Sequence, residues 1–243
     1  MVRSATRSDP CRSATEIDPR VRSFAEFATG LVSVAEARSA SQKKSLHATE
    51  RDTEANRKQR EEFIARIGTI PPEHLIFLDE SGVTTSMTRL YARSAGGERI
   101  CEATPGGRWK ILTILGAMSM RGIVASMTIE EATDGDIFLA YVEHILCPAL
   151  KPGDVVVMDN LSSHKIKGVR QLIETVGAEV LYLPPYSPDL NPIEKAWSKL
   201  KQLLRCAKAR TSHALEEAIA EAIRLITPDN AKAWFNHCFN GLQ

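Results

Sequence analysis

The chain has 243 residues, of which 43% are apolar and 25% charged, as is ordinary for a globular protein with room for one large domain or a smaller domain and an appendage. The formal net charge of +1 excludes an overall field that would attract nucleic acid, so any basic surface must be local. The five scattered cysteines exclude a disulfide framework and a zinc ribbon.

The same cysteine usage indicates a reducing compartment. No apolar run approaches the roughly 18 to 20 residues of a membrane span, and the start of the chain does not resemble a secretory signal. We therefore expect a cytoplasmic protein with no membrane partner.

The first 70 residues differ in composition from the rest. Residues 1–42 are rich in Ser, Ala, Thr and Arg and show helical spacing only within 20–37, which predicts a poorly ordered or degenerate segment. Residues 43–70 are densely charged and predict a linker helix over 43–67 that docks only its last turns. Two prolines, at 71 and 72, end that helix, and the remainder, 71–243, is predicted to be a single α/β domain.

Strand and helix patterns alternate through this domain. Residues 91–105 predict an irregular hairpin, 119–122 a tight turn between antiparallel strands, and Thr133 the N-cap of a helix. The predicted strands span 74–81, 111–118, 123–129, 155–158 and 179–183. The predicted helices span 134–150, 163–176, 192–207, 212–226 and 228–239.

The chain is organised around residues 155–194. This stretch opens with a β-branched run, typical of a covered parallel strand, that closes on Asp159. Open α/β sheets place their chemistry at the carboxyl ends of such strands. The stretch ends in a proline-rich turn that closes on Glu194, and its prolines stiffen the connection that delivers this acid to the first turn of the next helix.

A third acid, Asp79, lies where the strand predicted at 74–81 closes. Three carboxylates on rigid supports suit metal-assisted phosphoryl transfer, because Mg²⁺ and Mn²⁺ prefer oxygen ligands and a pair of ions can activate a nucleophile and stabilise the leaving oxygen. We predict that Asp79 bridges two ions while Asp159 and Glu194 flank it. An acid after a strand can also be a simple cap or turn former. Glu80 is expected to point away, and Asp189 to shape the turn.

Several other residues allow a functional or a structural interpretation. Asn160 could orient Asp159 or only form a turn, and His164 could contact a phosphate, support the metal site or begin a helix. Trp197 is expected to pack rather than to stack on a base. The basic residues that could neutralise DNA phosphates, or form a merely solvated or structural surface, are Arg89, Arg93, Lys195, Lys199, Lys201, Arg205, Lys208 and Arg210.

Three motifs, at 78–81, 158–165 and 183–194, together with Trp197 and Lys201, resemble the DDE transposases of bacterial insertion sequences related to the mariner group. Thirty-four residues, 160–193, separate Asp159 from Glu194, as in that family. Met87, Arg89, the pair 109–110 and the stretch 43–46 also match, so that the resemblance covers residue 43 to the end.

The resemblance implies a ribonuclease-H-like fold, with a mixed sheet flanked by helices, and catalytic and metal-binding roles for Asp79, Asp159 and Glu194. It also implies two Mg²⁺ or Mn²⁺ ions and cut-and-paste transfer of DNA ends, typically into TA targets. The expected partners are double-stranded DNA, as transposon ends and target, and a second copy or a full-length transposase. Such a protein would be nucleoid-associated when bound to DNA.

The front of the chain departs from that family, whose members usually begin with helix-turn-helix modules. Only residues 1–42 precede the match, which predicts a truncated copy or the downstream frame of a frameshifted element. Two alternatives to an active transposase domain therefore stay open. One is a structure-selective or RNA-cleaving nuclease on the same fold, and the other is a remnant that binds DNA or a full-length partner without catalysing transposition.

Overall fold

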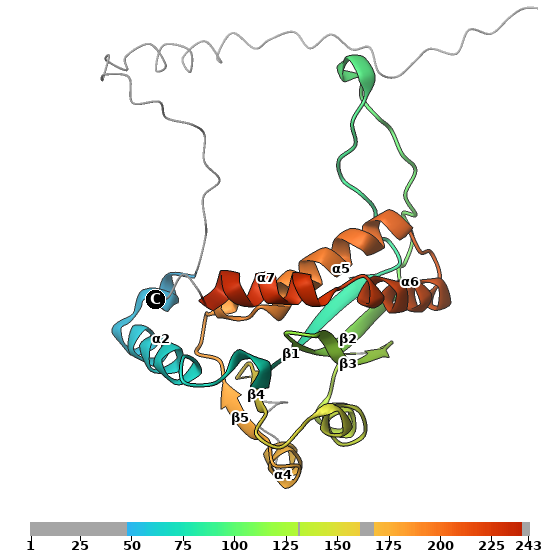
Figure 1. The fold of residues 1–243 in the computed structure, drawn as a ribbon. Coiled ribbons are helices and arrows are strands. Elements are labelled where there is room, and N and C mark those ends of the chain that lie inside the picture. Colours follow the sequence, from blue (N-terminus) through green and yellow to red (C-terminus); the bar gives the residue numbers. More distant parts are fainter. Residues whose placement is uncertain (1–47, 131, 161–167, 240–243) are drawn as a thin grey trace, which may run out of the picture. The chain divides into compact units, whose positions relative to one another are not determined.

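The computed structural model describes residues 48–130, 132–160 and 168–239. Within them lies a five-stranded sheet of order β3-β2-β1-β4-β5 (Figure 1). Its strands are β1 (Leu75–Thr84), β2 (Ile111–Ser119), β3 (Gly122–Ile129), β4 (Val155–Met158) and β5 (Glu179–Tyr182). The first three pair antiparallel, whereas β4 and β5 run parallel to β1. This mixed sheet confirms the predicted α/β class.

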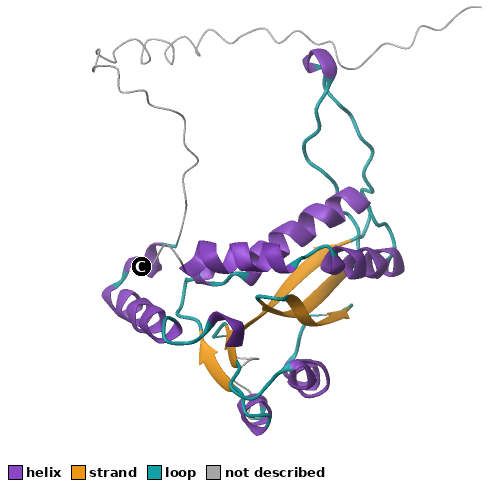
Figure 2. Cartoon of the chain, in the orientation of Figure 1, coloured by secondary structure: helices purple, strands orange, loops and turns teal. Residues whose placement is uncertain are grey.

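Helices cover both faces of the sheet, because its central strands are apolar on both sides (Figure 2). One face packs Phe77 and Val157 against α5 (Ile193–Ala207), α6 (Ser212–Arg224) and α7 (Pro228–Phe239). The other face packs Ile76 and Val156 against α3 (Gly135–Tyr141) and α4 (Val169–Thr175). None of the helices in the described ranges is long and apolar enough to cross a membrane.

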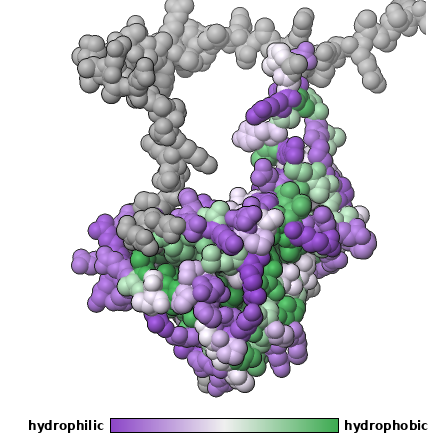
Figure 3. Space-filling view, viewed as in Figure 1, coloured by the Kyte–Doolittle hydropathy of each residue, from purple (hydrophilic) through white to green (hydrophobic). Residues whose placement is uncertain are grey.

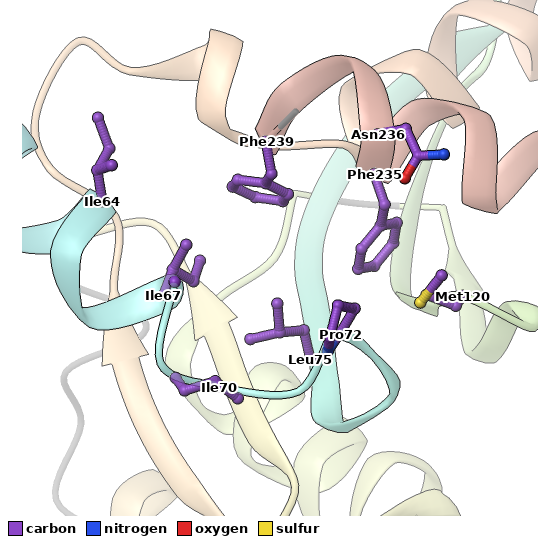
Figure 4. Close-up of a pocket in the computed structure, with 10 residues that line it drawn as sticks. Ile64, Ile67, Ile70, Pro72, Leu75, Met120, Phe235, Asn236 and Phe239 are labelled. Carbon is purple, nitrogen blue, oxygen red and sulfur yellow. The ribbon is translucent and has the colours of Figure 1, made fainter. Parts of the chain in front are cut away.

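The charged helix α2 (Glu54–Ile67) follows a 3-10 turn at Thr49–Asp52 and buries only Phe63 and Ile67. It begins later than predicted, and both 43–47 and the whole of 1–42 lie outside the described residues. Between α2, β1 and α7 lies an apolar cavity of about 240 Å³, where isoleucines of α2 face phenylalanines of α7 (Figure 4). None of the three predicted catalytic acids lines it.

Residues 85–110, here called the arm, contain no strand and only one 3-10 turn, at Ala95–Gly97 (Figure 1). The irregular hairpin predicted at 91–105 is therefore a loop that projects from the ends of β1 and β2. Arg210 anchors its base by donating hydrogen bonds to the carbonyls of Thr85 and Met87, at 3.0 and 2.9 Å. The arm bears apolar residues on its surface (Figure 3). Among them is Leu90, which is 81% exposed.

The helix predicted at 134–150 is regular only in its first half, since a π turn (Val142–Leu146) and a 3-10 turn (Cys147–Ala149) follow α3. Its N-cap is Asp134, whose carboxylate accepts a 2.8 Å hydrogen bond from the amide of Ile137. The prediction that Thr133 is the N-cap was wrong, because its hydroxyl is buried and has no hydrogen-bond partner. Of the helix predicted at 163–176 the structure describes α4, and 161–167 lie outside the described residues.

Candidate active site

The register of the sheet brings the two aspartates side by side. The last residues that β1 and β4 pair in parallel before their acids are Phe77 and Val157, and Asp79 and Asp159 each follow two residues later. Because side chains alternate along a strand, both acids lie on the same face as Phe77 and Val157, toward α5. Glu80 lies on the opposite face, as predicted.

Asp79 does not end its strand. The strand predicted over 74–81, which was expected to close on its acids, continues to Thr84 as an antiparallel partner of β2. The parallel pairing with β4 stops earlier, at Phe77. Asp79 therefore has a hydrogen-bonded strand on only one side, which holds its backbone rigidly while leaving space beside it.

The third acid enters from α5. Glu194 is the second residue of this helix, directly after the proline-rich turn. The turn carries a short 3-10 segment, Pro188–Leu190, and its last residues are tied by hydrogen bonds from the amide of Asn191 to the carbonyl of Pro188 and from the amide of Glu194 to the carbonyl of Asn191. One cavity of about 410 Å³ is lined by all three acids, Asn160, Asn191 and residues 183–188.

Helix α2 holds the proline-rich turn from outside. The Arg60 guanidinium donates to both carboxylate oxygens of Asp189, at 3.1 and 2.8 Å, and to the hydroxyl of buried Ser187, at 2.6 Å. Partial burial raises the pKa of Asp189, but the hydrogen bonds and charge of Arg60, with the charge of Arg51, outweigh it and hold this pKa below its usual value. Asp189 thus braces the turn, as predicted, rather than lining the acidic cavity.

We expect Arg60→Ala to lower the free energy of unfolding at pH 7 by about 1 kcal/mol, because it removes charge-assisted hydrogen bonds to a partly solvated carboxylate. Since the pKa of Asp189 is lower in the folded state, this stabilisation is present above the unfolded pKa, about 3.9, and is lost as pH falls through the folded value. Urea unfolding at pH 7 and pH 3 measures both.

Arg66→Ala is the matched control on the same helix. Its ion pair with Glu179 is half-exposed on both sides, so the expected cost is under about 0.5 kcal/mol. Equal losses in the two variants would show that Arg60 does not brace the turn.

The charged form of Asp79 is disfavoured in the folded protein. Burial, the charge of Glu194 and, less strongly, the charge of Asp159 raise the pKa of Asp79 to about 7, against the opposing hydrogen bonds from the backbone amide of Glu80 and the indole of Trp197. A nearby cation stabilises the ionised form of such a carboxylate. The electrostatics of the cavity therefore favour a divalent metal.

The donor atoms also fit Mg²⁺ or Mn²⁺. The three acids offer only carboxylate oxygens, and Asn191 adds a buried amide oxygen that has no hydrogen-bond partner. Within the described ranges, no three His, Cys, Asp or Glu side chains already stand close enough to hold one ion. The three acids and Asn191 nevertheless line one cavity, so they are the residues that would hold such an ion.

The other predicted site residues are only partly gathered here. Asn160 lines the acidic cavity, whereas His164 lies outside the described residues. Sequence reasoning missed two members, Asn191 and the indole donor of Trp197. Asn191 stands within the proline-rich motif, which could have marked it, but no local pattern reveals the partner of Trp197.

The predicted basic residues do not form one face. Arg89 and Arg93 of the arm, with Arg205 and Lys208 of the α5 end, line a groove of about 990 Å³. Lys199 instead donates to the carbonyl of Leu225 and to Asn230, at 2.6 and 2.5 Å. Lys208 also forms an ion pair with Glu102. Of the remaining basic residues, Lys195 is the neighbour of Glu194 in the chain, Lys201 is half-buried, and Arg210 lies at the base of the arm.

The mixed sheet, the helices on its two faces and the acidic cavity at the end of its parallel pairing define a ribonuclease-H-like domain. The family model described as DDE superfamily endonuclease matches residues 74–216, which is more than half of the chain. The chain belongs to this family.

Solved structures of a transposase share the fold. A Mos1 transposase paired-end complex with the left transposon end is 17% identical, with a TM-score of 0.67 over 91% of this chain and 67% of that one. The Mos1 mariner paired-end complex with Mn is 16% identical, with a TM-score of 0.65 over 93% and 69%. The catalytic domain of Mos1 mariner transposase is 15% identical, with a TM-score of 0.61 over 80% and 92%. A comparison with curated proteins finds no match.

Proposed function

We propose that this chain is the catalytic domain of a transposase, which cleaves DNA strands and joins them to a target with the help of divalent metal ions. The observation that carries the proposal is the single cavity lined by Asp79, Asp159 and Glu194. The family supports endonuclease chemistry. The structurally similar Mos1 transposase was solved as a paired-end complex with the left transposon end, and as paired-end complexes with Mn and with Mg.

In the proposed mechanism, Asp79, Asp159 and Glu194 would hold the divalent ions, and Asp79 would be the ligand that two ions share. The ions would supply activation of a water or hydroxyl nucleophile and stabilisation of the leaving oxygen. The chain's own contribution is placement: the sheet fixes the two aspartates, and the braced turn limits the movement of Glu194. Tyr186 of the turn, at the edge of this cavity, is 50% exposed, and a phosphodiester would enter beside it.

Nicking of supercoiled DNA in Mn²⁺ tests this proposal. We expect the wild type to convert the plasmid to open circles and Asp159→Asn to be slower by at least about 1,000-fold, because a metal ligand is lost. Glu80→Gln is the matched control, since this acid lies on the other face of β1, and it should keep the wild-type rate. Cleavage that survives in Asp159→Asn, or that needs no metal, would contradict the proposed site.

Strand joining separates a transposase from a simple nuclease. A labelled pre-cut end incubated with target plasmid and Mn²⁺ should give joined products, whereas a nuclease would give only fragments. A folded wild-type protein that neither cleaves nor joins would favour the non-catalytic alternative, in which the chain binds DNA or a full-length partner.

We further infer that the groove beneath the arm binds DNA phosphates through Arg89, Arg93 and Arg205, with Lys195 and Lys201 as contacts nearer the acids. We expect Arg205→Ala to weaken DNA binding and to reduce the slope of log affinity against log salt by about 1. Lys199→Ala is the control: its amine already serves Leu225 and Asn230, so it should lower thermal stability but leave the salt slope unchanged. Equal slopes for wild type and Arg205→Ala would remove Arg205 from the interface.

The motifs also support finer proposals. Residues 183–194 resemble the corresponding motif in the transposases of bacterial insertion sequences. We therefore infer that the DNA ends on which this chain acts are the terminal repeats of such an element. The protein would then work on nucleoid DNA, as a homodimer or with a full-length transposase. Gel filtration with multi-angle light scattering, with and without end DNA, tests the assembly.

A further inference from the structure

One side chain outside the three acids touches the candidate metal site directly. The indole nitrogen of Trp197 donates a 3.1 Å hydrogen bond to Oδ2 of Asp79. Trp197 is only 2% exposed, and it lies one helical turn after Glu194 on α5. The same helix therefore carries one metal ligand and a hydrogen-bond donor to another.

The sheet keeps space for this indole. Gly116 of β2 is the direct cross-strand partner of Asp79. A Cβ atom on Gly116 would stand 2.5 and 3.0 Å from two ring carbons of Trp197, and the shorter of these distances is closer than real Cβ contacts. The indole ring thus contacts the strand beside Asp79 at a point where only glycine leaves room.

The chemistry of this contact is specific. An indole N–H can donate but cannot accept a hydrogen bond, so it occupies one oxygen of the Asp79 carboxylate and fixes the rotation of the group. The carboxylate also accepts from the backbone amide of Glu80, and Asp79 lines the cavity that Asp159 and Glu194 share. Partners that orient metal ligands in this way commonly change metal affinity by about 10- to 100-fold when they are removed.

We propose that Trp197 is a positioning residue for the metal site: its indole N–H orients the Asp79 carboxylate toward a divalent cation shared with Asp159 and Glu194, and Gly116 provides the space for it. The proposal rests on the proposed function of the three acids. It assigns to Trp197 a role beyond the packing that the sequence predicts, because the acceptor of its buried indole N–H is one of the three acids.

Trp197→Phe is the test, since it keeps an aromatic ring in the core and removes only the donor and part of the ring system. Calorimetric titration of the full chain with Mn²⁺ should give about tenfold weaker binding than in the wild type. Half-maximal nicking should require about tenfold more Mn²⁺, with a smaller change in the rate at saturating metal. Trp234→Phe, a change of the same kind on α7, should leave both values unchanged.

A second measurement does not depend on the folding of Trp197→Phe. The chain has three tryptophans, so Trp109→Phe and Trp234→Phe assign the three indole N–H signals in a ¹H–¹⁵N spectrum. Titration with diamagnetic Mg²⁺ should shift the Trp197 signal and leave the Trp234 signal in place. An unmoved Trp197 signal in protein that binds Mg²⁺ would overturn the proposal.

The outcomes separate this inference from the proposed function. Equal Mn²⁺ affinity in the wild type and Trp197→Phe would overturn the positioning role and leave the acids as metal ligands. Weaker binding in the variant, with no cleavage by either protein, would support the positioning role and count against the catalytic function. A wild type that binds no Mn²⁺ would refute both.

Discussion

Asp79→Asn is expected to abolish metal-dependent nicking and, at pH 8 without metal, to raise the free energy of unfolding by on the order of 2 kcal/mol. The loss of activity follows from removing the proposed bridging ligand. The gain in stability follows from burial and from repulsion by Glu194, which raise the pKa of Asp79 to about 7 in the folded protein. Asparagine keeps the shape and can still accept from Trp197, but it carries no charge.

The pH dependence gives the sign of this effect. Because the folded protein holds the Asp79 proton more tightly than the unfolded chain, the wild type loses stability as pH rises from the unfolded pKa of 3.8 to the folded value of about 7. The variant has no such loss. The difference should therefore be small at pH 4, grow between pH 4 and 7, and level off above that.

Urea unfolding in EDTA at pH 4.5 and pH 8 measures this difference. Adding Mg²⁺ at pH 8 should stabilise the wild type and leave Asp79→Asn unchanged, because binding to the folded state alone raises stability. A variant less stable than the wild type at pH 8 without metal would show that the Asp79 charge is not disfavoured in the fold.

Gly116→Ala is expected to cost about 3 kcal/mol of unfolding free energy, the largest loss of stability that we predict for a single methyl group. The added Cβ would overlap the indole of Trp197, which is itself packed between α5 and the sheet and cannot simply rotate away. Gly82→Ala is the matched control in the neighbouring strand: no atom lies within 4 Å of its added Cβ, so stability should hardly change.

The origin of the Gly116 effect can be checked by a double change. Because Trp197→Phe removes the ring carbons that meet the new methyl group, it should make Gly116→Ala less harmful than it is alone. Thermal unfolding of the four proteins gives the coupling free energy. Additive effects would place the strain elsewhere in β2.

Local patterns were enough to predict most of this fold, and they failed where a tertiary contact decides. The β-branched run before Asp159 and the proline-rich block before Glu194 predicted both supports correctly. The strand predicted at 74–81 was expected to close on Asp79 and Glu80, yet pairing with β2 carries the strand through them to Thr84. Threonine and aspartate are both favoured at the N-cap, so the sequence alone does not choose between Thr133 and Asp134. In the structure the helix begins at Gly135, which makes Asp134 the N-cap.

The surroundings of the acids were harder to predict. In the sequence Lys199 resembles any basic residue on an exposed helix. In the structure its amine donates a hydrogen bond to the carbonyl of Leu225, at the end of α6. Trp197 was expected to pack, which it does, while its bond to Asp79 joins residues 118 positions apart. Spacing along the chain carries no information about such a pair.

The shared register of β1 and β4 has a consequence for the evolution of this chain. What places Asp79 beside Asp159 is the phase of each acid within its strand, not the length of chain between them. The arm and other connecting loops can therefore gain or lose residues without moving the two carboxylates apart. A single-residue deletion between Leu75 and Asp79, in contrast, would turn the acid to the opposite face and silence the site while leaving the composition almost unchanged.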